Sequence, residues 1–291
     1  MPISKKSRRL TGLTAASALA LATTACGDFD FELPEPKPVG CFIAGDGEEY
    51  NPNGEQAYYA ATIAAVGARD EMPERAIVIA LATAWQESSM KNIEYGDRDS
   101  VGLFQQRPSQ GWGTAEELQD PVYASNEFYR KLVLIDGWDS MTLTEAAQAV
   151  QISGHPDKYA KWETESTDMA EVFAEGRAEG IACTASRSRY GSTDTAELAA
   201  EYQSEWQAEG AADGRTIRFA VPDETRGWSV ANWAVTRSTM YAVESVTYAG
   251  KEWRPGELEW ADVENADASQ VAVTLLSPED QPSMPENGES S

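Results

Sequence analysis

Residues 74–89, which read ERAIVIALATAWQESS, are the stretch of this sequence that most strongly dictates a fold. Apolar residues occupy nearly every helical position, and a helix that is apolar all round is buried inside a domain. Pro73 stands where the first turn of a helix accepts a proline. We therefore predict a buried helix from Glu74 to about Met90, with Glu87 near its end.

Further helical and strand patterns set the expected domain organisation. Helical patterns cover residues 56–66, 121–134, 146–150 and 159–173. They predict a mainly helical domain over residues 41–185, and the polar residues 186–194 are the expected linker. Beyond the linker, helices are expected at 196–209 and 229–241, and strands at 216–221, 245–248 and 270–276. The expected fold class is α+β: the helical domain followed by a small α/β (or α+β) accessory domain over residues 195–276.

The charge balance excludes two classes of partner. The chain has 291 residues, with 48 acidic and 23 basic side chains and a formal net charge of −25. Such a surface repels nucleic acid and anionic lipid headgroups. With one histidine and no Cys-x-x-Cys motif, the sequence lacks the ligand set of a structural zinc site. We expect no nucleic-acid partner, no metal and no cofactor.

The first 26 residues have the pattern of an export signal. Four basic residues open the chain, Lys5, Lys6, Arg8 and Arg9. An apolar stretch follows over residues 13–25, too short to span a membrane comfortably. It ends in Ala25-Cys26-Gly27, which resembles a bacterial lipobox, so Cys26 is the expected lipidation site. The alternative is plain signal cleavage nearby. Either way the protein is expected outside the cell, anchored to the membrane by lipid or secreted to the cell wall.

Segments at both ends of the folded part have compositions that disfavour a packed core. Residues 27–40 carry spaced prolines and are expected to form an extended tether. Residues 277–291 are rich in proline, glutamate and serine and are expected to be disordered. Between them, Cys41 and Cys183 remain as one pair in an oxidising compartment, and a disulfide is expected, with two unrelated buried thiols as the alternative.

The chemistry of this sequence is concentrated around Glu87. A carboxylic acid can protonate a leaving group only if it stays protonated near neutral pH, and burial raises its pKa. Glu87 follows Trp85 at the end of a buried helix, where the helix dipole also favours the neutral acid. Ser88 is a candidate to orient the carboxyl group. The glycine-containing loop over residues 102–105 is a candidate to contact sugar hydroxyl and acetamido groups.

These motifs resemble those of a known superfamily. The Glu87-Ser88 pair, the sequence Gly-Leu-Phe-Gln at residues 102–105 and the helix start at Asp120-Pro121 resemble the lysozyme-like superfamily of goose-type lysozymes and soluble lytic transglycosylases. The phrase GLFQQRPSQGWG at residues 102–113 is similar to that of a group of secreted actinobacterial proteins. The resemblance implies a helical domain that cleaves the β-1,4 bond between N-acetylmuramic acid and N-acetylglucosamine in peptidoglycan, with Glu87 as general acid and base. Where the family has an Ala-Tyr-Asn motif, this chain has Ala149-Val150-Gln151, so the tyrosine that positions the catalytic glutamate is replaced by Val150.

The resemblance also implies roles for further residues. A hydrolase needs a second carboxylate, for which Asp97 and Asp99 are the near candidates, whereas a lytic transglycosylase needs only Glu87. The expected substrate-binding residues are Ser88, Gln105, Gln106, Trp112 and Gln151. Several of these residues have a structural role as the alternative: turn formation by the aspartates, a loop-bracing amide for Gln105, and core packing for Trp85 and Trp112. Arg107 is expected to meet either the muramyl carboxylate or a structural salt bridge.

Two classes of function are therefore expected from the sequence. One is an enzyme that cleaves or remodels peptidoglycan through Glu87. The other is a non-catalytic protein of lysozyme fold that binds wall glycan or a partner protein, which the replacement of tyrosine by Val150 favours. A solute-binding lipoprotein fits the tether but not the motifs around Glu87. The C-terminal domain has no defensible catalytic constellation, so a packing or binding module is expected, and the oligomeric state is left open.

Overall fold

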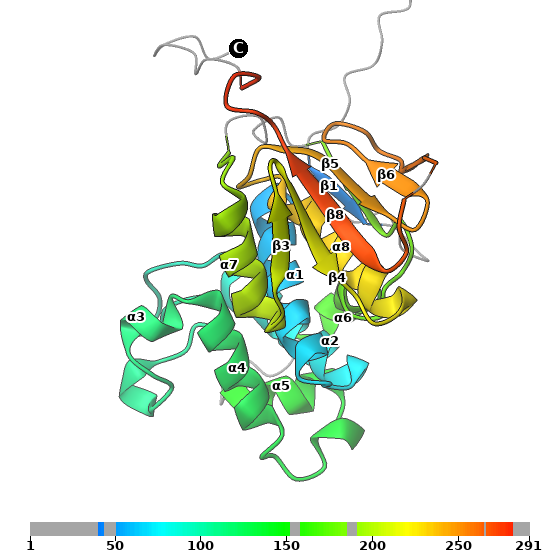
Figure 1. Cartoon of the computed structure of the whole chain (residues 1–291). Helices are drawn as coiled ribbons and strands as arrows, with labels where there is room; N and C mark the ends of the chain where they lie inside the picture. Colours follow the sequence, from blue (N-terminus) through cyan, green and yellow to red (C-terminus); the bar gives the residue numbers. More distant parts are fainter. Residues whose placement is uncertain (1–39, 44–50, 152–157, 185–190, 265, 282–291) are drawn as a thin grey trace, which may run out of the picture. The chain divides into compact units, whose positions relative to one another are not determined.

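The computed structural model describes residues 40–43, 51–151, 158–184, 191–264 and 266–281, all within one compact unit that starts at Lys37 (Figure 1). The predicted export signal, Cys26, most of the tether and the end of the C-terminal tail lie outside the described residues. The helices are α1 (Gly54–Arg69), α2 (Glu74–Ser88), α3 (Ala115–Leu118), α4 (Pro121–Leu132), α5 (Leu143–Gln151), α6 (Glu163–Phe173), α7 (Thr195–Trp206) and α8 (Glu224–Arg237). The strands are β1 (Cys41–Ile43), β2 (Ile181–Cys183), β3 (Gly210–Asp213), β4 (Thr216–Ala220), β5 (Val243–Tyr248), β6 (Lys251–Trp253), β7 (Ala261–Asp262) and β8 (Gln270–Leu275).

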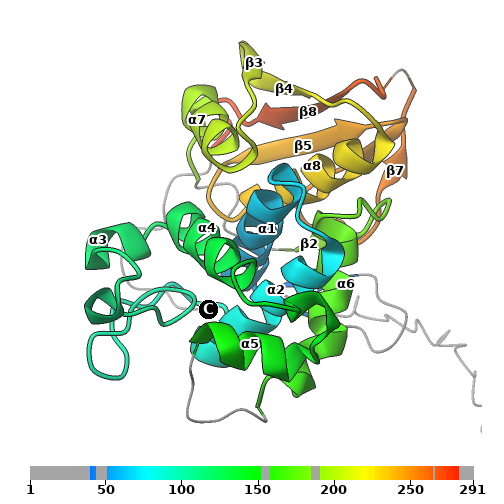
Figure 2. The same cartoon turned by 90° about the horizontal axis from the view of Figure 1, so that it is seen from below.

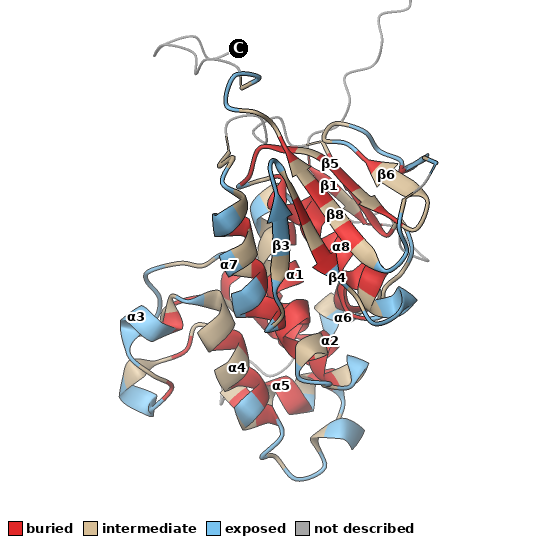
Figure 3. Ribbon diagram, viewed as in Figure 1, coloured by how far each residue is buried: buried red, intermediate tan, exposed pale blue. Residues whose placement is uncertain are grey.

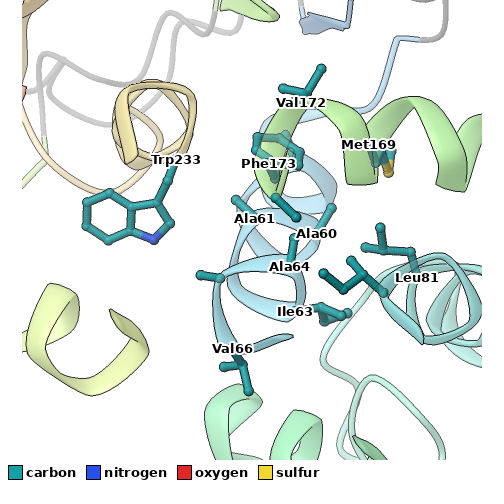
Figure 4. Packing of buried hydrophobic residues seen from close by; sticks show 14 of the residues in the cluster. Ala60, Ala61, Ile63, Ala64, Val66, Leu81, Met169, Val172, Phe173 and Trp233 are labelled. Atoms are coloured by element: carbon teal, nitrogen blue, oxygen red, sulfur yellow. The ribbon is translucent and has the colours of Figure 1, made fainter. Parts of the chain in front are cut away.

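Helix α2 lies at the centre of the helical layer, as its sequence predicts. It contacts α1, α4, α5 and α6, and all its residues from Ala76 to Trp85 are buried. Figure 4 shows the packing of Leu81 from α2 against side chains of α1 and α6. The helix ends at Ser88, two residues before the predicted end, because Ser89 and Met90 both adopt left-handed φ angles of 56°.

The ends of the other helices follow from local capping chemistry. Asn53 and Gln56 form a reciprocal capping box at the start of α1. Asp120 caps α4 and Pro121 occupies its first turn, as predicted. Helix α8 begins at Glu224, five residues before the predicted start, because the Asp223 side chain accepts a hydrogen bond from the backbone N–H of Arg226 at 2.8 Å.

The C-terminal region is built on a six-stranded sheet with the order β3-β4-β8-β5-β6-β7. Every pairing in this sheet is antiparallel, so the region is α+β and contains no parallel βαβ unit among the described residues. Alternate residues of β8, namely Val271, Val273 and Leu275, are buried beneath the sheet, and Figure 3 shows the burial concentrated there and in the helices behind it. Strands β1, β2, β3, β6 and β7 were not predicted, because two to four residues are too few for a periodic pattern.

The two expected domains share one core. Helix α1 contacts α2, α4 and α6 on one side and α7 and α8 on the other, and Figure 2 shows it between the sheet and the lower helices. Arg237 of α8 is fully buried at this junction. Its guanidinium donates to both carboxylate oxygens of Glu205 at 2.5 Å and lies 2.9 Å from Glu201, both of α7. Arg237 also donates to Thr62 of α1 at 3.0 Å, so one buried cation joins three helices.

The predicted disulfide between Cys41 and Cys183 is present. It connects the paired strands β1 and β2, and both cysteines are fully buried. A bond that closes a loop of this length, 142 residues, stabilises the folded state by roughly 4–5 kcal/mol in the chain-entropy picture. No helix in the described part of the chain is long and apolar enough to cross a membrane.

Candidate functional site

The Glu87 carboxyl group sits in the last turn of α2 and is half-buried. The hydroxyl of Tyr159 donates a hydrogen bond to Glu87 Oε1 at 2.5 Å. Tyr159 is fully buried in the turn before η4 (Ala160–Trp162), so its ring is fixed by the surrounding core and its hydroxyl is aimed at the acid. A buried tyrosine hydroxyl needs a polar partner, and here the partner is the acid itself.

Gln151 connects the acid to the glycine-containing loop. It is the last residue of α5, and its side-chain amide donates to the carbonyl oxygen of Phe104 at 2.6 Å. The same side chain forms a hydrogen bond with Glu87. The ring of Phe104 stacks on Phe128 of α4, with 4.8 Å between ring centroids. The structure therefore brings Glu87, Gln151 and this loop together, and the Gln151 side chain, which was expected to contact substrate, forms its hydrogen bonds within the protein.

The environment of Glu87 favours its protonated form. Burial raises the pKa of Glu87 above its ordinary value, and the hydrogen bonds from Tyr159 and Gln151 oppose this only in part. Both partners are uncharged donors, and no lysine or arginine in the described residues contributes to the pKa. A carboxyl group in such surroundings can give up a proton and take it back, because no fixed positive charge holds it ionised.

The tyrosine expected at position 150 comes from elsewhere in the chain. Val150 is buried on the core face of α5, as its position in the helix dictates. Tyr159, eight residues beyond Gln151, supplies the hydroxyl instead. The sequence motif alone misses this residue, because Tyr159 lies outside the motif and a helical pattern does not indicate which distant residue a side chain contacts. The replacement of tyrosine by Val150 therefore no longer argues against a functional Glu87.

Ser88 does not orient the Glu87 carboxyl group, contrary to expectation. Its hydroxyl is buried and donates to the carbonyl oxygens of Leu103 at 2.8 Å and Ala84 at 3.1 Å. It also accepts a hydrogen bond from the backbone N–H of Lys91 at 3.1 Å. Helix geometry points residue 88 to a different face from residue 87. Ser88 consequently anchors the loop over residues 102–105 to the end of α2.

The two glutamines of this loop are also engaged within the protein. The Gln105 amide donates to the carbonyl oxygens of Tyr95 and Gly102, both at 3.3 Å, which is the bracing role given as its alternative. Gln106 is only 1% exposed and donates to the carbonyl oxygen of Ala124 at 3.1 Å, so its expected contact with substrate is wrong in this conformation. Gly102 has a φ of 78°, and a Cβ there would lie 2.4 Å from the carbonyl oxygen of Leu118.

Asp97 and Asp99 differ in their availability as a second carboxylate. Asp99 accepts hydrogen bonds from the backbone N–H of Ser109 at 2.7 Å, from the Ser109 hydroxyl at 3.0 Å and from Arg107 Nε at 2.9 Å. The hydrogen bonds from Ser109, and then that from Arg107, hold the pKa of Asp99 well below its usual range. Arg107 thus forms the structural salt bridge of the two alternatives. The side chain of Asp97 is 92% exposed.

Trp112 and Trp85 both belong to the core. Trp112 is buried, and the ammonium group of Lys131 lies 3.3 Å from its ring centroid. Trp85 stacks on Trp162 at 5.3 Å and donates to the sulfur of Met169 at 3.5 Å. Neither ring is free to stack on a sugar, so the predicted contact of Trp112 with substrate is wrong in this conformation and the core-packing alternative holds for both.

Glu87 does not line either of two cavities whose walls consist of described residues. One, of about 510 Å³, lies between the end of α1 and the start of α8, and the other, of about 550 Å³, lies beside the first half of α5. The described residues contain no group of three or more potential metal-ligating His, Cys, Asp or Glu side chains. Among the described residues, the candidate site contains the Glu87 carboxyl group with two uncharged hydrogen-bond donors, an arrangement that can support proton transfer.

No protein-family model matches the sequence, and no curated protein matches it.

Proposed function

We propose that this protein binds glycan strands of peptidoglycan and cleaves the β-1,4 bond between N-acetylmuramic acid and N-acetylglucosamine, with Glu87 as the proton donor and acceptor. The observation that carries the proposal is the hydrogen bond from Tyr159 to a half-buried Glu87 whose pKa is raised by burial. The resemblance of the Glu87-Ser88 and 102–113 motifs to the lysozyme-like superfamily supports the choice of substrate.

A single acid is sufficient for the transglycosylase version of this reaction. Glu87 donates its proton to the glycosidic oxygen, and the bond from that oxygen to the muramyl anomeric carbon breaks. The 6-hydroxyl of the same muramyl residue then forms a bond to the anomeric carbon and returns its proton to Glu87. The product is a 1,6-anhydromuramyl end, no water is consumed, and the enzyme ends in its starting protonation state.

The arrangement of the aspartates supports this version over hydrolysis. A hydrolase places a second carboxylate to activate water or to attack the sugar. Asp99 is committed to Ser109 and Arg107, which leaves the exposed Asp97 as the remaining candidate on the loop. A hydrolytic reaction would therefore depend on Asp97, whereas transglycosylation would not.

A non-catalytic glycan-binding protein is the second candidate function. The observation that favours it is the engagement of Ser88, Gln105 and Gln106 within the protein, because these side chains were expected to contact substrate. In this case Glu87 and Tyr159 would position a sugar by hydrogen bonds without cleaving it.

The decisive experiment is digestion of purified peptidoglycan by the chain that begins after residue 26, followed by mass spectrometry of the products. We expect 1,6-anhydromuramyl products, and a loss of rate of about 10²- to 10⁴-fold in Glu87→Gln. The matched control is Glu116→Gln, which removes an exposed carboxylate of α3 and should leave the rate unchanged.

Each other outcome identifies a different alternative. Reducing-end products that disappear in Asp97→Asn would establish hydrolysis. Retention on insoluble peptidoglycan without any product would establish the non-catalytic candidate. Full activity in Glu87→Gln would show that Glu87 is not the acid.

Export and lipid anchoring at Cys26 complete the proposal. Their support is the basic start, the apolar stretch and the Ala25-Cys26-Gly27 sequence. The test is the intact mass of the mature protein from the membrane fraction of a bacterial host. A diacylglyceryl group on Cys26, absent in Cys26→Ala, is the expected result, and an unmodified N-terminus would establish plain cleavage.

A further inference from the structure

Tyr95 differs from every other aromatic residue in the described part of the chain. Its side chain is 76% exposed, while all the other described tyrosine, tryptophan and phenylalanine residues are buried or half-buried. An aromatic ring that is fully presented to water contributes nothing to the core, although its apolar faces remain available for a ligand. Trp85 and Trp112 are covered, so among the described residues Tyr95 is the exposed aromatic side chain on the segment between Glu87 and the glycine-containing loop.

Hydrogen bonds connect Tyr95 to the acid through the loop over residues 102–105. Gln151 bonds to Glu87 and donates to the carbonyl oxygen of Phe104 at 2.6 Å. The next residue, Gln105, donates to the carbonyl oxygen of Tyr95 at 3.3 Å. The backbone at Gly96 is packed so closely against Gln105 that a Cβ there would lie 1.8 Å from Gln105 Oε1. Hydrogen bonds and the backbone of residues 104 and 105 thus link Tyr95 to Glu87.

The loop that carries Tyr95 is held firmly on both sides. The carbonyl oxygen of Ile93 accepts hydrogen bonds from the backbone N–H of Gly102 at 2.8 Å and from the Gln119 amide at 2.9 Å. The Asn92 amide donates to the carbonyl oxygen of Gln119 at 2.7 Å. A binding residue on a braced backbone loses less conformational freedom when its ligand arrives. The backbone that carries the Tyr95 ring is therefore held in place before a ligand arrives.

The charges around Tyr95 select the type of sugar. Glu94 adjoins it in the sequence and is exposed, whereas the carboxylate of Asp97, two positions further on, lies 3.9 Å from Arg98 Nε. The carboxylate of a muramyl residue would be repelled by this negative charge, whereas an uncharged N-acetylglucosamine residue would not.

We propose that Tyr95 is a binding platform on which a neutral N-acetylglucosamine residue of the glycan strand stacks, beyond the residues held at Glu87. This inference rests on the proposed function, because it extends the glycan-binding site of Glu87 along the loop over residues 92–105. The hydroxyl of Tyr95 is not required for stacking, while the aromatic ring is.

The test is the affinity of the chain for a hexamer of N-acetylglucosamine, measured by calorimetry in the Glu87→Gln background so that no sugar is cleaved. Tyr95→Ala should weaken binding by about 3- to 10-fold, which corresponds to the energy of one aromatic contact. Tyr95→Phe and Tyr95→Trp should bind as tightly as the parent. Leu134→Ala is the matched control, because Leu134 is 70% exposed on the loop after α4 and should not affect binding.

The outcomes separate this inference from the proposed function. If the parent binds the hexamer and Tyr95→Ala binds equally well, the platform is refuted while the function of Glu87 stands. If Tyr95→Phe is as weak as Tyr95→Ala, the hydroxyl rather than the ring makes the contact, and stacking is refuted. If the parent fails to bind and the wild-type chain also releases no product from peptidoglycan, both proposals fall. If product is released without measurable hexamer binding, only the platform falls.

Discussion

Glu87 and Glu205 are both glutamates packed between helices, but their partners differ in charge. Glu205 is buried at the junction of α1, α7 and α8, where Arg237 contacts both of its carboxylate oxygens. Trp233 and Thr62 donate to it as well, at 2.6 and 3.0 Å. Glu87 is half-buried, and its donors among the described residues are the uncharged side chains of Tyr159 and Gln151. The first carboxylate is part of an ion pair, and the second is held by uncharged donors.

The difference separates a structural acid from a candidate catalytic one. Burial alone would lower the pKa of Arg237, but the carboxylates of Glu205 and Glu201 outweigh it and raise the pKa. The guanidinium therefore remains charged at every accessible pH. It also lies 4.3 Å from the ring centroids of Tyr58 and Trp233, in cation–π contact with both. Burial raises the pKa of both Glu205 and Glu87, but at Glu205 the positive charge of Arg237 opposes the effect, whereas at Glu87 the opposing groups are the uncharged donors Tyr159 and Gln151.

The largest effect is expected at the ion pair. Arg237→Met should lower the free energy of unfolding by about 3–5 kcal/mol, because it leaves the carboxylate of Glu205 buried without its cation. Denaturant unfolding followed by circular dichroism measures the change. Arg130→Met is the matched control, since Arg130 pairs with Glu127 on the surface and should cost less than about 1 kcal/mol.

A loss of stability in Arg237→Met no greater than in Arg130→Met would contradict this prediction. It would mean that the junction tolerates an unpaired acid, and that the ion pair does not hold the sheet region to the helices.

The sequence predicted the parts of this comparison that depend on local pattern. The burial of α2 follows from residues 74–88, which leave no polar face, and the position of Glu87 follows from counting along that helix. The capping of α4 by Asp120 is likewise local. The antiparallel order of the sheet and the sharing of one core by both regions depend on contacts between distant segments. No local sequence pattern indicates the strand order or the shared core.

The sequence predicted Glu87, the acid of the candidate site, but not Tyr159, its hydrogen-bond partner. Tyr159 is separated from Glu87 by 72 positions of sequence, and no local pattern indicates that the two side chains meet. The roles of Ser88 and Gln106 were wrong because a motif identifies residues near a site but not the direction of each side chain. Ser88 points to Leu103 and Gln106 to Ala124, since both brace the loop. Arg237 carried no signal at all, because arginine inside a helix is usually exposed.

A smaller effect is expected from Tyr159→Phe, which removes the hydroxyl and keeps the ring. Loss of one hydrogen bond to a half-buried carboxyl group should reduce stability by about 1–1.5 kcal/mol. The hydroxyl donates to the ionised form and lowers the pKa of Glu87, so its removal should raise that pKa further. Because the protonated acid starts the reaction, the alkaline limb of the activity profile should move to higher pH. Carbon NMR titration of the Glu87 carboxyl group measures the same shift without activity.

A downward shift of the Glu87 pKa in Tyr159→Phe would contradict the assignment of Tyr159 as a donor to the carboxylate. The matched control is Tyr241→Phe, which removes a hydroxyl that donates to Glu201, a partner of Arg237, at 2.7 Å. This variant should leave the titration of Glu87 unchanged.

The smallest expected effect is a change in the free energy of unfolding of Glu87→Gln. Unlike the decrease expected in Arg237→Met, it is an increase. In the unfolded chain Glu87 titrates near its ordinary pKa, about 4.3. In the folded chain the pKa is higher, so between the two values the folded state binds more protons and its stability falls as the pH rises. Glutamine does not titrate but still accepts the hydrogen bond from Tyr159. The stability of Glu87→Gln relative to wild type should therefore increase from pH 4 upward and level off above the folded pKa, as measured by thermal unfolding at a series of pH values.

Glu116→Gln, at an exposed position, should show no such trend. A relative stability of Glu87→Gln that is constant or decreasing over this range would mean that Glu87, like Glu205, is held by a charge, and the distinction between the two acids would be lost.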